Sequence, residues 1–193
     1  MANIICVRPI WDREALPMPR KLQYRRGDRL HPVKFFPVHV GPEPDHPVGR
    51  KGHVLARAWE QLRGSPPADG LLILDGDVAV DPEHTRAMIE AIDSDCTRVW
   101  TAPVRIWPVS THRQDWVWAH WEDHASQELD MFPRYFSFSF TYLPAGLVDK
   151  AIRGGMKTWH YPHVDSSMSR VARDHGFKAQ MVEDCFPVHM HWA

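Results

Sequence analysis

The sequence predicts an α/β fold in which a mostly parallel sheet is flanked by helices. Through the first half of the chain, short apolar runs of strand length alternate with segments of helical periodicity. The run Leu71–Leu74 has no polar residue, which is typical of a central parallel strand buried on both faces. A length of 193 residues with 44% hydrophobic content suits one globular domain of Rossmann-like design, so residues 1–193 are expected to form a single unit.

The predicted strands are short segments with apolar or alternating patterns. Pro9 is expected to close the first of them. Along Tyr135–Tyr142 the pattern alternates cleanly, which predicts the aromatic side chains on one face and Ser137, Ser139 and Thr141 on the other. In chain order the predicted strands are Ile4–Val7, Phe35–Val40, Leu71–Leu74, Val99–Ile106, Tyr135–Tyr142 and Phe177–Val182.

Helices are predicted where apolar residues recur every three or four positions between start and stop signals. Gly64 ends the first helix, Asp81 caps the second with Pro82 in its first turn, and Gly176 stops the last. The polar, basic stretch 12–31 lacks a period and is predicted as a loop with one helical turn. The apolar helix positions are Val54, Ala58, Trp59 and Leu62, then Met88, Ile89 and Ile92, then a short helix over Leu147–Arg153, and finally Val164, Met168, Val171, Ala172 and His175.

Composition excludes several classes of protein. A net charge of −1 gives no global field that would draw the chain onto nucleic acid or an anionic membrane. The basic residues between Arg20 and Arg29 are the exception, and they suit either a solvated loop or a contact with an anionic acceptor. Cys6, Cys96 and Cys185 are odd in number and far apart, which excludes a disulfide framework. Without a signal peptide or an apolar run of membrane-spanning length, a cytoplasmic location is expected.

Two carboxylates follow the predicted central strand directly, at Asp75 and Asp77. Two such charges near 4 Å apart repel by about 4 kcal/mol at an effective dielectric of 20. A fold retains them where a positive group lies nearby, and a divalent cation with oxygen ligands is the natural candidate. His189 and His191 fall on one side of an extended segment, so they could add imidazole ligands, although paired histidines also suit an exposed tail.

This strand, Asp-x-Asp and turn at mid-chain resemble the GT-A fold of nucleotide-sugar glycosyltransferases. In that family the motif holds Mn²⁺ or Mg²⁺ against the diphosphate of the donor. The resemblance implies that Asp77 ligates the metal directly, and that Asp75 acts through water or holds the ribose. A C-terminal histidine supplies a third protein ligand in many of these enzymes, and His189, or else His191, matches it.

Two more segments are similar to the inverting, family-two branch of that fold. The segment Gly49–Arg57 looks like the glycine-rich helix start that faces the donor, although Ala58 stands where an asparagine is usual. A basic helix start suits a diphosphate, but it also suits an exposed helix end. The resemblance implies donor contacts from Asp45 at the base, from Arg50, Lys51 and Arg57 at the phosphates, and from Asp75.

The second segment begins at Gly154-Gly155 and runs through Asp165 to Gly176. It resembles the family's Gly-Gly…Glu-Asp-x-Asp-Leu…Gly stretch, which implies that Asp165 is the general base that deprotonates the acceptor hydroxyl. Such catalysis contributes about 10²–10⁴-fold. The family's glutamate, second aspartate and arginine are replaced here by Val164, Ser167 and Val171. Asp165 would also suit a helix N-cap, and the two roles are compatible.

The resemblance therefore implies one GT-A-like domain, with residues 1–100 as the nucleotide-sugar-binding half and residues 101–193 as the acceptor half. The expected activity is metal-dependent, inverting transfer of a sugar from a nucleotide diphosphate donor. The acceptor hydroxyl would belong to a small molecule, a protein or a modified nucleic acid, with no membrane partner. Two alternatives remain open: a haloacid-dehalogenase-like phosphohydrolase with Asp75 as nucleophile, and a GT-A module that binds nucleotide or sugar without turnover.

Overall fold

The computed structural model describes most of the chain. The described residues are 2–10, 22–26, 29–33, 35–39, 51–64, 67–76, 78–102, 105–107, 136–159, 164–182, 184–185 and 187–190. Their strands are β1 (Ile4–Ile10), β2 (Leu22–Arg26), β3 (Arg29–Val33), β4 (Phe35–His39), β5 (Gly70–Leu74), β6 (Val78–Ala79), β7 (Val99–Thr101), β8 (Arg105–Trp107), β9 (Phe140–Pro144), β10 (Ala179–Met181) and β11 (Val188–Met190). Their helices are α1 (Lys51–Leu62), α2 (Pro82–Ser94), α3 (Ala145–Arg153), the 3₁₀ turn η2 (Met156–Thr158) and α4 (Val164–Asp174).

A six-stranded sheet with the order β10-β7-β9-β5-β1-β4 forms the centre of the fold. Only β9 runs against its neighbours β5 and β7, and every other pair in this sheet is parallel. The predicted mostly parallel, Rossmann-like α/β fold is confirmed. Because β9 lies between β5 and β7, strands from the first and second halves of the chain are neighbours in this sheet. The remaining strands form two smaller sheets, with the orders β6-β11-β8 and β2-β3.

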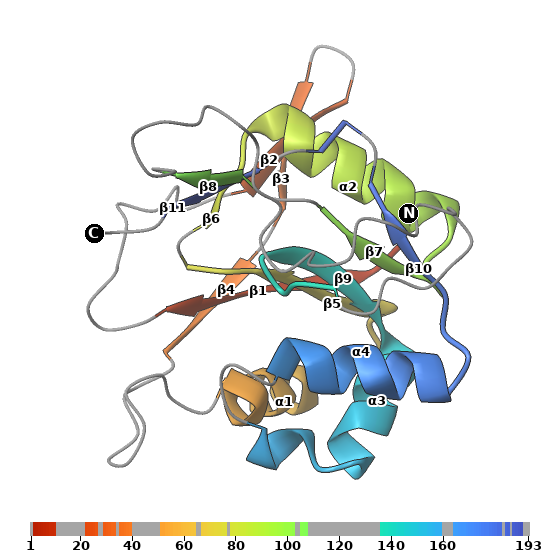
Figure 1. The fold of residues 1–193 in the computed structure, drawn as a ribbon. Coiled ribbons are helices and arrows are strands. Elements are labelled where there is room, and N and C mark those ends of the chain that lie inside the picture. Colours follow the sequence, from red (N-terminus) through yellow and green to blue (C-terminus); the bar gives the residue numbers. More distant parts are fainter. Residues whose placement is uncertain are drawn as a thin grey trace.

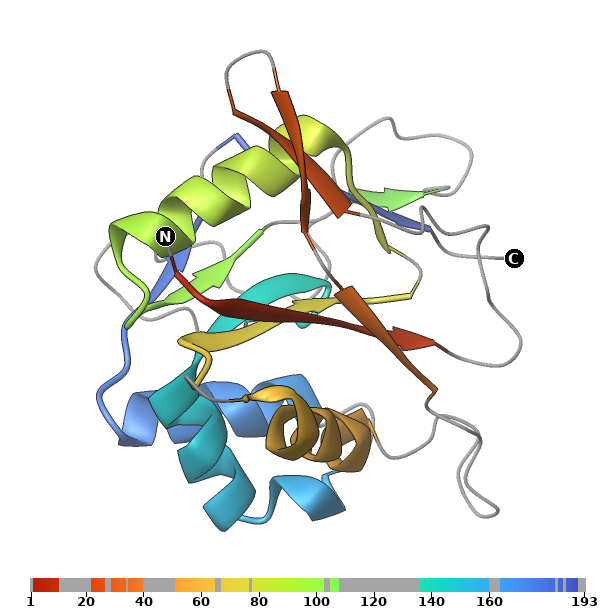
Figure 2. The same cartoon turned by 180° about the vertical axis from the view of Figure 1, so that it is seen from behind.

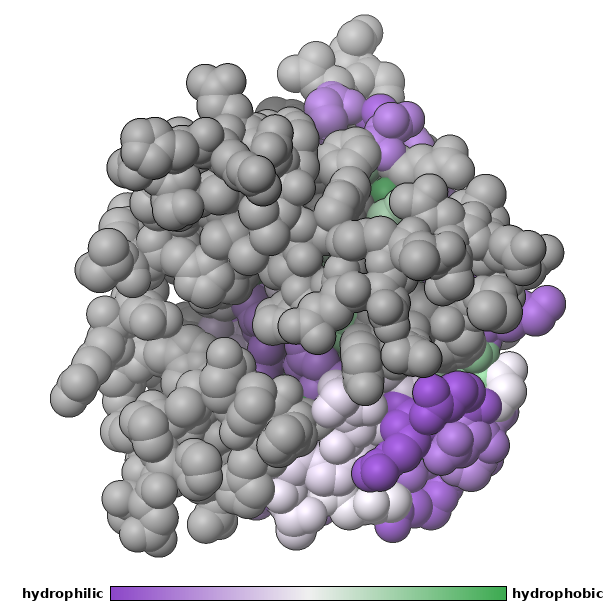
Figure 3. Space-filling view, in the orientation of Figure 1, coloured by the Kyte–Doolittle hydropathy of each residue, from purple (hydrophilic) through white to green (hydrophobic). Residues whose placement is uncertain are grey.

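Helices cover both faces of the central sheet (Figure 1). Helix α2 lies on one face, beside the hairpin β2–β3, and α1, α3 and α4 lie together on the other (Figure 2). On the face seen in Figure 3, the described surface over α3 and α4 is purple or white, which means hydrophilic or intermediate in hydropathy. No helix in the described part of the chain has both the length and the apolar character needed to cross a bilayer.

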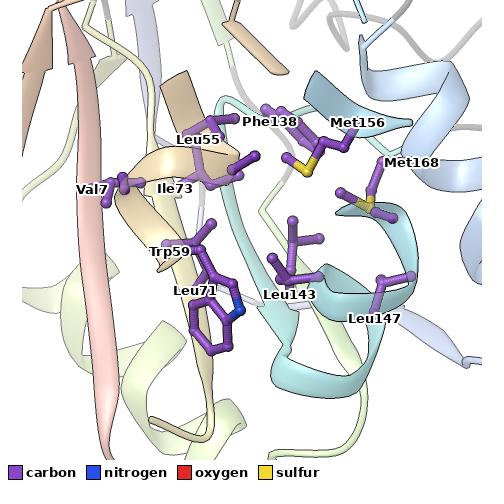
Figure 4. Packing of buried hydrophobic residues seen from close by; sticks show 14 of the residues in the cluster. Val7, Leu55, Trp59, Leu71, Ile73, Phe138, Leu143, Leu147, Met156 and Met168 are labelled. Carbon is purple, nitrogen blue, oxygen red and sulfur yellow. The ribbon is translucent and has the colours of Figure 1, made fainter. Parts of the chain in front are cut away.

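The run in β5 is wholly apolar because its side chains point alternately to the two faces of the sheet, and both faces are covered. Leu71 and Ile73 point into the core cluster beneath the sheet, which contains Trp59 of α1 and Leu147 of α3 (Figure 4). Leu72 and Leu74 join the opposite cluster against α2. All four leucine and isoleucine side chains are therefore buried, as a central strand with two covered faces requires. The predicted central strand is confirmed.

Helix α2 begins as predicted. Asp81 accepts a hydrogen bond from the backbone N–H of His84 at 2.8 Å, and Pro82 occupies the first turn. Met88, Ile89 and Ile92 form its buried face. The stops at Gly64 and Gly176 are also confirmed, because both glycines have positive φ angles that other residues rarely adopt. Local signals decided these helix ends.

Several predicted elements are wrong in detail. The stretch 12–31 predicted as loop contains β2 and the first residues of β3, which form an antiparallel hairpin. Pro9 does not close the first strand, which continues to Ile10. The strand predicted over Val99–Ile106 is two strands, β7 and β8, in different sheets. The chain also forms β11 after the predicted last strand.

The aromatic alternation before β9 was misleading. The chain bends at Phe138 and β9 begins only at Phe140, so the alternation does not belong to one straight strand. Phe136 and Phe138 pack in the cluster with α1, α3 and α4, whereas Phe140 and Tyr142 pack in the cluster with α2. The predicted shared face of these four residues is therefore wrong. The bend places a buried, non-strand segment, 136–139, at the end of the sheet.

Gly52 fixes how closely helix α1 approaches η2. A Cβ atom at this position would meet the carbonyl oxygen of Met156 well inside van der Waals contact, and would lie 3.0 Å from that of Trp159. We expect Gly52→Ala to lower the free energy of unfolding by about 1–3 kcal/mol, because backbone atoms must move. The matched control is Gly146→Ala in α3, where the nearest atom lies 3.6 Å away in Phe177. That variant should gain up to about 1 kcal/mol from helix propensity, and urea unfolding that gave both changes the same sign would contradict this account.

Burial raises the pKa of the Cys6 thiol to about 12 from its ordinary 9.0, while nearby Arg8 lowers it in part. Above pH 9 the unfolded chain releases this proton and the folded protein retains it, so rising pH favours the unfolded state. We expect this group to reduce the free energy of unfolding by about 1.4 kcal/mol per pH unit between 9 and 12. Urea unfolding at pH 8 and pH 10.5 should show a shallower decline for Cys6→Ala than for the wild type, and parallel declines would refute the prediction.

Candidate functional site

Five parts of the chain meet at one edge of the central sheet. They are the end of β1, the end of β5, the start of α1, the segment 136–139 and the start of α4. The parallel strands β1 and β5 both end at this edge. Ligands of open α/β sheets bind in the crevice outside such carboxyl ends, so the side chains here define the candidate site.

Lys51 and Asp75 form an ion pair at the centre of this edge. Lys51 Nζ lies 2.5 Å from Asp75 Oδ1, and the two side chains are only 7% and 15% exposed. The Coulomb attraction at that separation is about 7 kcal/mol at an effective dielectric of 20, although desolvation of both groups offsets much of it. The ammonium also lies 5.5 Å from the centre of the Phe138 ring. Lys51 is thus a positive group that accompanies the carboxylate of Asp75.

Arg8 holds the turn that carries the second aspartate of the motif. Its guanidinium donates hydrogen bonds to the carbonyl oxygens of Gly76 at 2.7 Å and Val78 at 3.4 Å. The side chain is 2% exposed, and a buried arginine in an otherwise apolar strand is costly without such partners. The carbonyls on either side of Asp77 are therefore fixed by a buried cation from β1.

The start of α4 is attached to segment 136–139 by two hydrogen bonds. The backbone N–H of Phe138 donates to Asp165 Oδ2 at 3.1 Å, and that of Phe136 donates to Ser169 Oγ at 3.0 Å. Ser169 Oγ in turn donates to the carbonyl oxygen of Asp165 at 2.8 Å. Asp165 is the second residue of α4 rather than the residue that caps it. Its half-buried carboxylate is held in place by Phe138.

A row of buried hydroxyls runs from this segment into the sheet. Ser137 Oγ and Ser139 Oγ are 2.6 Å apart, and Thr141 donates to the carbonyl oxygen of Ser137. Thr101 on β7 reaches Thr141 across the strand pair at 2.8 Å. The backbone N–H of Asp75 donates to the carbonyl oxygen of Ser139 at 2.9 Å. The hydroxyl row therefore braces the bend that contacts both Asp75 and Asp165.

The backbone of β11 runs beside the same turn. In the antiparallel pair with β6, His189 is the register partner of Val78. Val78 follows Asp77 directly in the sequence. The strand that carries one of the two candidate histidine ligands is thus adjacent to the strand that follows the Asp-x-Asp motif. Among the described residues, no three His, Cys, Asp or Glu side chains are grouped as a metal site.

Of the predicted site residues, the structure brings together Lys51, Asp75 and Asp165. Arg57 is exposed on α1. It lies six residues after Lys51, about 120° around the helix and about 9 Å along it, so it does not share Lys51's face. The predicted residues that lie outside the described part of the chain are Asp45, Arg50, Asp77 and His191.

Sequence reasoning missed Arg8 and segment 136–139 as parts of this site. The signal for Arg8 is a single charged residue inside the apolar run of β1, which requires a buried partner. For the segment, the hydroxyl residues alternate with aromatic ones, and hydroxyls that face a sheet interior need partners as well. Neither signal identifies the residues with which these side chains form hydrogen bonds.

Comparisons with known proteins identify no family. No family model matches the chain, and no curated protein matches it. Among solved structures, the chain is similar to the crystal structure of A197 from STIV, with a TM-score of 0.46 and 12% sequence identity over 93% of this chain and 81% of that chain. A likeness at this level supports no conclusion about function.

Proposed function

We propose that this protein is a GT-A-type glycosyltransferase that moves a sugar from a nucleotide diphosphate donor to an acceptor hydroxyl, with inversion. One observation carries the proposal: Lys51, Asp75 and Asp165 come from three distant parts of the chain and meet around segment 136–139. A buried cation, an acid after the central strand and a second oriented acid are the groups that such a transfer uses.

In the proposed reaction, Lys51 and the start of α1 receive the donor diphosphate, since free backbone N–H groups and the helix dipole favour an anion there. Asp165 takes the proton of the acceptor hydroxyl as that oxygen attacks the sugar carbon. The N–H of Phe138 holds Asp165 Oδ2 and thereby sets the direction of the carboxylate. The proton moves to Asp165, and the bond between sugar and phosphate breaks with its electrons going to the diphosphate.

A bound Mn²⁺ or Mg²⁺ would offset the charge that builds on the departing diphosphate. Carboxylate and imidazole donors suit Mn²⁺, and the residues that would hold it are Asp75, Asp77 and His189 or His191. The pairing of His189 with Val78 supports this set, because it brings the backbone of β11 beside the motif. The three free thiols support the further proposal of a cytoplasmic location, where thiols remain reduced.

The deciding experiment is a calorimetric screen of nucleoside diphosphates and their sugars with and without Mn²⁺. We expect one donor to show Mn²⁺-dependent binding. In Asp77→Asn the affinity for this donor in the presence of Mn²⁺ should fall at least about 100-fold, since a metal ligand is removed. Circular dichroism should show an unchanged fold. Unaltered Mn²⁺-dependent affinity in this variant would remove Asp77 as a metal ligand.

Two further assays on the same protein distinguish the glycosyltransferase from the two alternative functions. Binding of a nucleoside diphosphate without transfer to any of a broad acceptor panel would indicate a binding module. Hydrolysis of an aryl phosphate with Mg²⁺ that disappears in Asp75→Asn would instead indicate a phosphohydrolase with Asp75 as its nucleophile.

A further inference from the structure

We propose that Lys51 and a divalent cation compete for Asp75, so that Lys51 couples the binding of the cation to the binding of the diphosphate. This inference rests on the proposed function, because it takes these two charged ligands as the ligands of the site. It adds a regulatory role for a residue that the sequence assigned only to phosphate binding.

The geometry of the ion pair carries the competition. Lys51 Nζ lies 2.5 Å from Asp75 Oδ1, and both side chains are largely shielded from water. A cation that takes this oxygen as a ligand would come close to the ammonium, and the two positive groups would repel strongly in a poorly solvated site. Binding of the cation to this oxygen therefore requires Lys51 to move away.

Arg8 makes the free site still less favourable for a lone cation. Its buried guanidinium contacts the carbonyl oxygens of Gly76 and Val78, so the Asp75–Val78 turn already has two positive side chains beside it. A divalent ion that binds there alone therefore meets the positive charge of both side chains.

A diphosphate reverses this balance. Its oxygens offer Lys51 another anionic partner at the start of α1, where the helix dipole also favours negative charge. When Lys51 turns to the phosphate, the carboxylate of Asp75 becomes available to the cation. Each ligand then raises the affinity of the site for the other, as thermodynamic linkage requires.

The test titrates Mn²⁺ alone and inorganic pyrophosphate alone into the wild type and Lys51→Gln. Glutamine can still donate a hydrogen bond to Asp75 but carries no charge. We expect this variant to bind Mn²⁺ at least tenfold more tightly and pyrophosphate at least tenfold more weakly. A misfolded protein would lose both affinities, so the opposite signs identify competition.

The matched control is Lys157→Gln, which removes a lysine whose Nζ lies 2.7 Å from Glu60 in an exposed ion pair. Both of its affinities should equal those of the wild type. If Lys51→Gln does not fold, wild-type protein labelled with ¹⁵N provides the answer. Addition of Mg²⁺ should then shift the side-chain Nζ resonance of Lys51 but not that of Lys157, and an unmoved Lys51 resonance overturns the inference.

The outcomes distinguish this inference from the proposed function. Equal Mn²⁺ affinity in the wild type and Lys51→Gln overturns the competition and leaves the glycosyltransferase proposal intact. Absence of Mn²⁺ binding in both proteins overturns the competition and the metal dependence together. If pyrophosphate also fails to bind, the donor site itself is wrong.

Discussion

Replacement of Asp165 by asparagine should reduce sugar transfer by about 10²–10⁴-fold and leave donor binding near normal. The reason is that the amide cannot accept the acceptor proton, so the contribution of general base catalysis is lost. The asparagine side-chain oxygen can still accept the hydrogen bond from the N–H of Phe138, now at 3.1 Å. The start of α4 should therefore remain attached to segment 136–139, and the loss should fall on kcat.

The matched control for this prediction is Asp174→Asn, at the exposed far end of the same helix. It removes one carboxylate from α4 without touching the site, and its transfer rate should equal that of the wild type. Single-turnover kinetics with a saturating donor would measure both variants. Retained activity in Asp165→Asn would exclude this residue as the base.

Loss of the central ion pair should have the largest effect on stability among the exchanges at this site. Lys51→Met removes the ammonium and leaves the carboxylate of Asp75, 15% exposed, without that partner. We expect the free energy of unfolding to fall by about 2–4 kcal/mol, as for other largely buried pairs from which one member is removed. The double variant Lys51→Met with Asp75→Leu should recover most of this loss, because the carboxylate is removed together with the ammonium that pairs with it.

Lys157→Met provides the comparison, since its ion pair with Glu60 is 43% and 40% exposed. Surface pairs of this kind contribute about 0–1 kcal/mol, so this variant should unfold close to the wild-type urea midpoint. Equal losses for the two lysine variants would show that burial at the sheet edge adds nothing to the pair. A double variant no more stable than Lys51→Met would show that the cost arises from packing rather than charge.

Parts of the fold with strong local signals were predictable. The wholly apolar run of β5 and the Asp81-Pro82 start of α2 match the structure because short stretches of chain determine them. Elements decided by distant partners were not predictable. For example, β2 and β3 pair with each other and pack beside the distant helix α2. No hydrophobic period in their sequence predicts these strands.

The site shows the same division. The sequence located Lys51, Asp75 and Asp165 as charged residues at the ends of expected elements, and resemblance gave each a role. It did not indicate that Lys51 pairs with Asp75 or that Phe138 orients Asp165. Those contacts depend on how α1 and α4 cross the edge of the sheet, and on the bend before β9.

By itself, the sequence determined that an apolar strand would end in two aspartates and that two helices would begin with basic and with acidic residues, because burial and periodicity act on neighbouring residues. Only the tertiary structure decided which charges meet. Arg8 reaches the turn after β5 from another strand, and Lys51 reaches Asp75 from a helix. The physical reason is that charge pairing depends on separation in space and on the exclusion of water, and both are set by the packing of elements that are distant in the chain.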